Sequence, residues 1–211
     1  MNTKYVEGWF LPKRDEYFER VLQKYPLEND GKRIYQFEHL DRCFHHLETS
    51  NKRVAIDIGA HIGFWSYYLC KNFSHVYSFE PLNIHTECFI KNVTFSNSTL
   101  YKVALGNEKN KVRFNIPYEI SGKASILERE NGDIELLTLD SYNFKIDVEG
   151  YEKFVIEGSR KTILENKPIL IIEQKNNSNF NIGQYDAVEE LKSMGAIILE
   201  RVVDDFILGW R

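Results

Sequence analysis

Short apolar runs alternate with helix-like stretches over most of the chain. The run Val54–Ile58 is rich in β-branched residues and almost continuous, which is typical of a strand covered on both faces of a parallel sheet. In the stretch that follows, 64–72, Phe64, Tyr68 and Leu69 fall on one helical face. Strands that alternate with helices in this way predict an α/β fold built on a parallel sheet.

The same alternation extends toward the end of the chain. Further strands are expected at 75–80, 100–105, 144–148 and 169–173, and further helices at 84–93, 151–166 and 185–194. The last apolar segments, 196–202 and 206–210, are separated by a turn at Asp204-Asp205 and predict an antiparallel hairpin. The overall expectation is a mostly parallel sheet with a C-terminal antiparallel hairpin.

Two regions depart from this alternation. Residues 106–139 contain turn sequences around an alternating segment, which indicates an insertion with β-hairpin character. Residues 1–50 are rich in aromatic side chains, are broken by Pro12 and Pro26, and take on helical spacing near their end. We expect 1–50 to form an N-terminal helical cap that belongs to the same domain as 51–211.

The composition fits one folded domain. The chain has 211 residues, of which 43% are hydrophobic, and this is enough to build a core. Its 27 basic and 31 acidic residues are interspersed and give a net charge of −4, so neither nucleic acid nor a membrane is an expected partner. The start lacks the apolar run of a signal peptide, and no later stretch approaches the roughly 20 apolar residues of a membrane span. A cytoplasmic protein is expected.

The cysteines and one histidine are interpreted as packing residues. Cys43, Cys70 and Cys88 are an odd number without CxxC spacing, so buried reduced thiols are expected. His85 is interpreted as a surface or packing residue on a helix. Carboxylate oxygens suit Mg²⁺, but no spacing in the chain requires a metal, and none is expected.

The stretch 57–63, Asp-Ile-Gly-Ala-His-Ile-Gly, joins the first strand to the first helix of the alternating region. Its glycines let the backbone approach a ligand closely at the carboxyl edge of the sheet. A nicotinamide or flavin fingerprint requires glycine where this chain has His61 and Phe64, so an NAD-linked oxidoreductase is disfavoured. Asp57 at the head of the loop suits the ammonium and sulfonium groups of S-adenosylmethionine.

Glu80 ends the second strand at the same edge of the predicted sheet. A carboxylate there can accept hydrogen bonds from both hydroxyls of a ribose. The structural alternatives are a helix N-cap for Glu80 and a satisfied turn at the strand end for Asp57. Ala104 and Leu105 end the third strand, where they lie against adenine or simply pack.

Several sequence blocks occur together in one order. They are VAIDIGAHIG at 54–63, FEP at 79–81, VALG at 103–106, TLD at 138–140, KIDVEGYE at 145–152 and PILIIE at 168–173. In this combination the chain resembles the FkbM family of methyltransferases. The resemblance implies a Rossmann-like methyltransferase fold, S-adenosylmethionine as the methyl donor, and an acceptor hydroxyl on a sugar, glycan or secondary metabolite. The candidate cofactor-binding residues are Asp57, Gly59, Ala60, His61, Gly63, Glu80, Pro81, Ala104 and Leu105.

The block KIDVEGYE supplies the candidates for catalysis. Lys145, Asp147 and Glu149 alternate, so in an extended strand they share one face at the cofactor edge. Asp147 is the first candidate for contact with the donor's amino end or for the base that acts on the acceptor, and Glu149 is the second. Lys145 orients the acceptor or pairs with these acids. An ion-pair cluster that caps the next helix is the alternative.

One departure from the family pattern bears on activity. Only residues 141–144 separate the TLD block from KIDVEG, where family members have a longer segment, so the fourth strand is expected to be short. A catalytically weakened regulatory module that still binds S-adenosylmethionine is therefore the alternative to an enzyme. The loop at 121–125 contacts substrate by analogy or is mobile. The sequence leaves the acceptor and the oligomeric state open.

Overall fold

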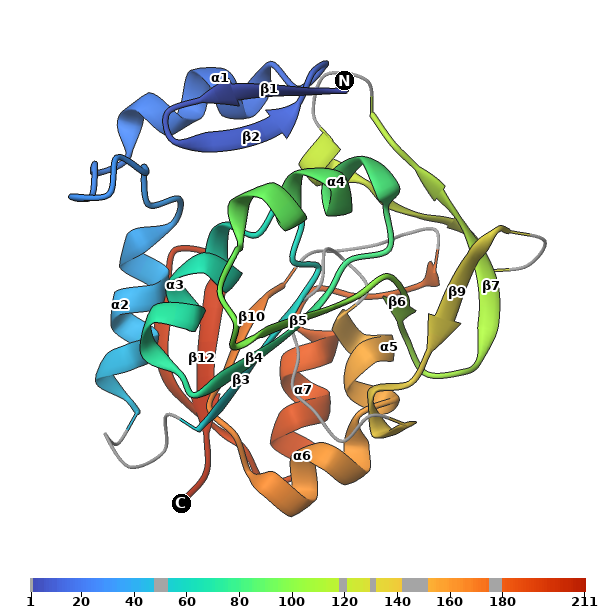
Figure 1. Ribbon diagram of the computed structural model, residues 1–211. Helices are drawn as coiled ribbons and strands as arrows, with labels where there is room; N and C mark the ends of the chain where they lie inside the picture. Colours follow the sequence, from blue (N-terminus) through green and yellow to red (C-terminus); the bar gives the residue numbers. More distant parts are fainter. Residues whose placement is uncertain (1, 48–52, 118–120, 130–131, 142–151, 175–179) are drawn as a thin grey trace.

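The computed structural model describes residues 2–47, 53–117, 121–129, 132–141, 152–174 and 180–211 (Figure 1). The strands are β1 Thr3–Val6, β2 Trp9–Pro12, β3 Val54–Ile58, β4 His75–Phe79, β5 Ser98–Tyr101, β6 Ala104–Leu105, β7 Asn110–Asn115, β8 Ser125–Glu128, β9 Ile134–Leu137, β10 Leu170–Glu173, β11 Ile197–Val202 and β12 Asp205–Gly209. The α-helices are α1 Tyr17–Val21, α2 Phe37–His45, α3 Phe64–Asn72, α4 Asn83–Asn92, α5 Glu152–Glu157, α6 Arg160–Asn166 and α7 Asp186–Ser193. Short 3₁₀ turns are η1 Leu22–Lys24, η3 Ser121–Lys123 and η4 Leu139–Ser141.

The strands β3, β4 and β5 form a parallel sheet in that order, as the apolar runs predict. Ile58 lies opposite Phe79, and Phe79 lies opposite Tyr101. Ile58 and Phe79 are 2% and 1% exposed, which is the burial expected of strands that are covered on both faces. Because the carboxyl ends of parallel strands meet at one edge, the loop after β3 and the residues after β4 are brought together.

The third predicted strand, 100–105, is divided between two sheets. β5 pairs with β4, whereas β6 pairs in parallel with β9 of the insertion. β7 is antiparallel to both β8 and β9, so the insertion completes a sheet in the order β6-β9-β7-β8. The predicted hairpin character of 106–139 is thus confirmed, and the expectation of one continuous third strand is wrong.

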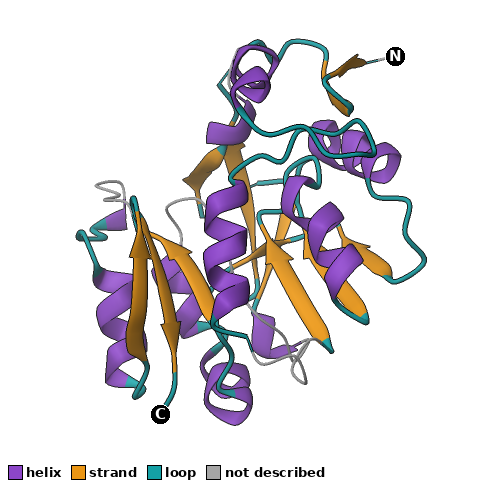
Figure 2. Cartoon of the chain, turned by 90° about the vertical axis from the view of Figure 1, so that its left-hand side faces the viewer, coloured by secondary structure: helices purple, strands orange, loops and turns teal. Residues whose placement is uncertain are grey.

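The predicted C-terminal hairpin is present as β11 and β12, which are antiparallel. The turn residues are Val203 and Asp204, with Val203 at a φ of 57°, one position before the predicted turn. β12 also pairs antiparallel with β10, so the order of this sheet is β10-β12-β11. Parallel pairing among the described strands is therefore confined to β3-β4-β5 and β6-β9, and the expectation of a mostly parallel sheet is not met there. Figure 2 shows the C-terminal strands beside the strands of the parallel sheet, with helices packed around both groups.

The predicted N-terminal helical cap is wrong for its first residues, because β1 and β2 form an antiparallel hairpin. Val6 pairs with Trp9, and the two residues between them, Glu7 and Gly8, have φ angles of 50° and 89°. Two consecutive positive φ angles are typical of the two-residue turns that match the twist of a hairpin. The helical spacing expected near the end of this region is confirmed by α2.

The hairpin packs on α4 near the loop that follows β3 (Figure 1). Asn92 of α4 makes this connection: its side-chain oxygen accepts from the N–H of Phe10, and its Nδ2 donates to the carbonyl oxygens of Phe10 and Ile62 at 3.0 and 2.9 Å. The N-terminal segment is therefore attached directly to the predicted cofactor loop.

The helix predicted at 151–166 is two helices, α5 and α6, which are interrupted at Gly158. A Cβ at Gly158 would lie 1.9 Å from the carbonyl oxygen of Gly106. This close approach of two backbone segments requires glycine, and it places the beginning of the insertion against the break between the helices.

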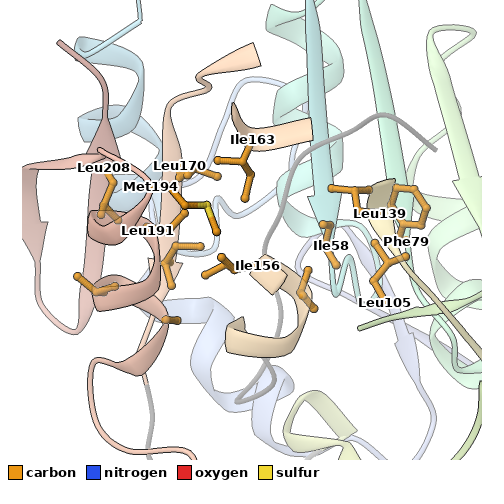
Figure 3. Packing of buried hydrophobic residues seen from close by; sticks show 14 of the residues in the cluster. Ile58, Phe79, Leu105, Leu139, Ile156, Ile163, Leu170, Leu191, Met194 and Leu208 are labelled. Carbon is orange, nitrogen blue, oxygen red and sulfur yellow. The ribbon is translucent and has the colours of Figure 1, made fainter. Parts of the chain in front are cut away.

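One of the hydrophobic clusters joins the parallel strands, the insertion and the C-terminal sheet. Figure 3 shows Ile58, Phe79, Leu105 and Leu139 close together on one side, Leu170, Leu191, Met194 and Leu208 on the other, and Ile156 and Ile163 between the two groups. The helices α5 and α6 thus fill the space between the parallel and the antiparallel strands. The three cysteines are buried free thiols, as predicted. Within the described residues, no helix combines the length and the apolar character needed to cross a membrane.

We predict that Gly63→Ala destabilises the protein more than Gly31→Ala does. Both glycines have positive φ, 93° and 78°, so alanine costs about 1–2 kcal/mol at either position through backbone strain. At Gly63 the new Cβ would also lie 2.5 Å from Cγ2 of Val93, whereas at Gly31 it meets nothing within 4 Å. Overpacking of this kind adds roughly 1–3 kcal/mol. Urea unfolding of both variants measures the difference, and equal losses of stability would contradict the close packing of the loop on α4.

Candidate functional site

A pocket opens at the carboxyl edge of the parallel sheet, where the sequence predicts the cofactor site. It is lined by the loop after β3, the end of β4, the first turn of α4, the residues around β6, and one side of the insertion. The lining residues are Ile58, Gly59, His61, Phe79, Glu80, Pro81, Leu82, His85, Val103, Ala104, Leu105, Phe114, Ser121, Gly122, Ala124, Ser125 and Ile126. The apolar side chains come mainly from the strand ends and the insertion, and the polar ones include Glu80, His61 and His85.

The carboxylate of Glu80 is the most connected polar group of the pocket, although only 4% of the residue is exposed. Its Oε2 accepts a hydrogen bond from the N–H of His61 at 2.9 Å. Its Oε1 accepts from the N–H of Leu82 at 2.9 Å and lies 3.1 Å from Nδ1 of His85. Hydrogen bonds from N–H groups offset the cost of burying a carboxylate. Glu80 therefore holds the loop after β3 and the start of α4 around the pocket.

The loop after β3 follows a path that depends on its glycines. Gly59 has a φ of 76°, and the N–H groups of Gly59 and Ala60 both donate to the carbonyl oxygen of Phe79. Gly63, the N-cap of α3, has a φ of 93° and packs against Phe89 of α4 and Val93 at its C-terminal end. The loop is thus fixed to the end of β4 on one side and to α4 on the other, and its backbone at Gly59 faces the pocket.

Asp57 does not line the pocket. Its Oδ2 accepts a hydrogen bond from Oγ of Ser66 at 2.5 Å, and Oγ of Ser66 lies 2.8 Å from Oγ of Ser78. This chain of buried polar groups connects β3, α3 and β4 below the loop. Burial raises the pKa of Asp57 to about 6, hydrogen bonds from the hydroxyl and the backbone N–H of Ser66 oppose this rise, and the nearby charge of Glu80 adds to it.

Two histidines face each other beside Glu80. The rings of His61 and His85 meet edge to face, with centroids 4.1 Å apart. Burial, followed by the proximity of His85, holds the pKa of His61 well below its ordinary value, so His61 is a neutral imidazole near pH 7. Nε2 of His61 is 3.3 Å from Oγ of Ser121 in the opposite wall.

The N-terminal segment holds that wall in place. Asp15 is fully buried, and its Oδ2 accepts hydrogen bonds from the N–H of Ser121 at 3.1 Å and from Oγ of Ser121 at 2.5 Å. Its Oδ1 accepts from the N–H of Phe18 at 3.1 Å, and the Phe18 ring packs on Gly122 and on His61. The turn η3 is therefore fixed between the N-terminal segment and the loop after β3.

The structure brings most of the predicted cofactor residues together. The residues that line the pocket are Gly59, His61, Glu80, Pro81, Ala104 and Leu105. Asp57, Ala60 and Gly63 belong to the same strand and loop without lining it. Lys145, Asp147 and Glu149, predicted for catalysis, lie outside the described residues.

Sequence reasoning missed two parts of the site. His85 is 2% exposed and lines the pocket, whereas its interpretation was a surface or packing residue. Its position, five residues after an acidic strand end and within the first turn of a helix, is the signal that could have identified it. The wall at 121–126 depends on Asp15 and Phe18, which are about a hundred residues away in sequence. A local sequence pattern cannot predict a contact over this separation. In the described part of the chain, no group of three or more histidine, cysteine, aspartate or glutamate side chains is arranged to hold a metal ion.

A family model described as the methyltransferase FkbM domain matches residues 120–198. The FkbM resemblance is confirmed. The match contains the TLD, KIDVEGYE and PILIIE blocks and begins at the wall of the pocket, while the loop after β3 and Glu80 lie before it. A search of curated proteins finds no significant match.

Solved methyltransferase structures resemble this fold. The FkbM methyltransferase of Methylobacillus flagellatus is 20% identical, with a TM-score of 0.48, over 76% of this chain and 43% of that protein. This chain thus spans less than half of that FkbM protein. A precorrin-6y C5,15-methyltransferase of Geobacter metallireducens is 14% identical and aligns over 90% of this chain and 95% of its own, with a TM-score of 0.51. At this identity the similarity to the Geobacter protein shows a shared α/β fold and no more.

We predict that Asp57→Asn flattens the dependence of stability on pH. Between its ordinary pKa of 3.8 and its raised pKa of about 6, the folded protein keeps a proton that the unfolded chain has lost, so the free energy of unfolding falls as pH rises through this window. The stabilisation is complete below the lower pKa and absent above the higher one. Asparagine retains an acceptor for Ser66 and does not titrate.

The measurement is urea unfolding of wild type and Asp57→Asn at about pH 4.5 and about pH 7. Between these two pH values the variant should gain about 2 kcal/mol of stability relative to wild type. Asp204→Asn is the matched control, because the Asp204 side chain is 75% exposed and should show no such gain. A difference in stability between variant and wild type that is the same at both pH values would contradict the raised pKa of Asp57.

Proposed function

We propose that this chain binds S-adenosylmethionine in the pocket beside Glu80 and transfers its methyl group to a hydroxyl on a sugar, glycan or secondary metabolite. The observation that carries the proposal is the position of the Glu80 carboxylate. It lies at the carboxyl end of a central parallel strand, lines the pocket, and is held by the N–H of the glycine-containing loop that follows the neighbouring strand.

The chemistry of the pocket fits the parts of the donor. Ala104, Leu105 and Ile126 provide an apolar surface for a purine ring. Glu80 provides an acceptor for a ribose hydroxyl. The backbone at Gly59 faces the side where the methionine portion would lie. Open α/β sheets bind ligands at this edge of the strands, and a few polar groups in a largely apolar pocket are typical of a small-molecule site.

The methyl transfer itself requires little from the protein beyond positioning. The acceptor oxygen attacks the methyl carbon while the bond from carbon to sulfur breaks, and the positive charge of the sulfonium is lost. Holding the two reactants in line contributes about 7–11 kcal/mol in well-oriented intramolecular reactions. The acceptor hydroxyl must also lose its proton, so a base near the transition state accelerates the reaction.

Asp147 is our first candidate for this base, Glu149 is the second, and Lys145 is a candidate for orienting the acceptor. These assignments follow from the family resemblance and from the alternation of the three residues along the block KIDVEG. Support for the family comes from the FkbM match, which includes this block. No observation in the described residues favours the regulatory alternative.

We predict that the protein binds S-adenosylhomocysteine, the demethylated product of the donor, and that Glu80→Gln weakens this binding at least about tenfold. Glutamine replaces one carboxylate oxygen by an NH₂ group, which cannot accept from His61, Leu82 or a ribose hydroxyl. Isothermal titration calorimetry measures the affinities. Glu87→Gln is the matched control, because Glu87 is exposed on α4, the helix that follows Glu80, and the affinity of this variant should equal that of wild type.

The outcomes separate the competing functions. No heat of binding from the wild-type protein would falsify the cofactor assignment. Binding of NADH instead, measured by fluorescence titration, would favour an oxidoreductase. Normal affinity for S-adenosylhomocysteine without methyl transfer from labelled donor to a broad panel of hydroxyl acceptors would favour the regulatory module.

A further inference from the structure

His85 carries a buried polar atom for which the protein provides no partner. The residue is 2% exposed and lines the pocket, yet its Nε2 makes no hydrogen bond. Buried polar atoms are nearly always hydrogen-bonded, and an unsatisfied one costs roughly 1–3 kcal/mol. Because Nε2 of His85 lies in the wall of a pocket, a ligand bound there can supply the missing hydrogen bond.

The contacts of His85 determine which kind of partner Nε2 requires. Nδ1 lies 3.1 Å from Oε1 of Glu80. An ionised carboxylate only accepts hydrogen bonds, so in the neutral imidazole the proton is on Nδ1 and Nε2 carries a lone pair. The edge-to-face contact with His61 fixes the plane of the ring. His85 therefore presents a preoriented acceptor to a donor group such as a hydroxyl.

The hydrogen bonds of Glu80 show why a second acceptor is needed. Oε1 already accepts from the N–H of Leu82 and from His85, which occupies both of its lone pairs. Oε2 accepts from the N–H of His61 and has one lone pair left. The carboxylate can thus take one further hydrogen bond, whereas a ribose has two hydroxyl donors.

Nε2 of His61 cannot serve as that second acceptor. This atom is directed at Oγ of Ser121, and the Ser121 hydroxyl donates its proton to Asp15. The hydroxyl oxygen of Ser121 therefore accepts, and Nε2 of His61 is the donor. Of the two Nε2 atoms in the pocket, only that of His85 offers a lone pair to a ligand, because the lone pair of neutral His61 is on Nδ1.

We propose that Glu80 and His85 bind the ribose diol of the methyl donor jointly: Oε2 of Glu80 accepts from one hydroxyl and Nε2 of His85 accepts from the other. This inference rests on the proposed function and assigns to His85 a direct role in ligand specificity. It makes the pocket selective for a nucleoside with both hydroxyls over either deoxynucleoside.

The variant that tests the inference is His85→Asn. The Nδ2 of asparagine lies near the position of the histidine Nδ1 and can donate to Glu80, while the acceptor at Nε2 is removed. Calorimetry compares S-adenosylhomocysteine with its 2′-deoxy and 3′-deoxy analogues. Wild type should bind each analogue about tenfold more weakly than the parent compound, since each lacks one hydrogen bond to a buried partner.

His85→Asn should bind the parent compound about tenfold more weakly than wild type does. For one of the two deoxy analogues, its affinity should equal the affinity that wild type has for that same analogue. That analogue lacks the hydroxyl that His85 accepts. If the role of His85 were purely structural, the substitution would lower the affinities for all three ligands by the same factor. Equal losses of affinity would therefore overturn the inference. His45→Asn, at a side chain that is 66% exposed on α2, is the control and should change none of the affinities.

The remaining outcomes are also decisive. If wild type binds the parent compound and His85→Asn binds it with the same affinity, the inference about His85 is overturned and the proposed function is not. A wild-type protein that does not bind the parent compound would overturn the proposed function as well. If His85→Asn does not fold, His85→Gln takes its place, because the glutamine Oε1 reaches the position of Nε2, and this variant should keep most of the discrimination between the three ligands.

Discussion

The carboxylate of Glu80 is the interaction on which the candidate site depends. It is almost completely buried, and the N–H groups of His61 and Leu82 and the ring of His85 surround it. These three partners belong to the loop after β3, the residues after β4 and the first turn of α4. One charged group thus fixes three segments around the pocket, and its burial is tolerated because each oxygen has a hydrogen-bond donor. The same group leaves one lone pair available for a ligand.

The two strand-end carboxylates that the sequence places among the cofactor-binding candidates have different surroundings. Asp57 is directed away from the pocket toward Ser66 and Ser78, where it connects the first two strands to α3. Its raised pKa reflects burial with few donors, whereas Glu80 is surrounded by N–H groups. A strand-end acid next to a glycine loop is therefore not sufficient to predict that the acid lines the pocket. Which way the side chain turns depends on the donors that the neighbouring elements supply.

The parts of the fold that could be predicted are those encoded by local pattern. The first strand and helix of the α/β region, Val54–Ile58 and 64–72, have the expected bounds. Burial on both faces requires a continuous apolar run, and an amphipathic helix requires apolar residues at helical spacing, so both are visible in the sequence. The N-terminal hairpin escaped prediction because its turn, Glu7-Gly8, is not one of the common hairpin dipeptides. The break at Gly158 escaped because it depends on a contact with Gly106, about fifty residues away in sequence.

The same distinction applies to the pocket. Its floor, at Gly59, Glu80 and Ala104, follows from the ends of parallel strands and could be predicted. Its wall could not, because Ser121 is held by Asp15, a residue of the N-terminal segment. No described residue before Ile58 lines the pocket, yet that segment determines where the wall stands. Residues that do not line the pocket, Asp15 among them, can therefore shape it.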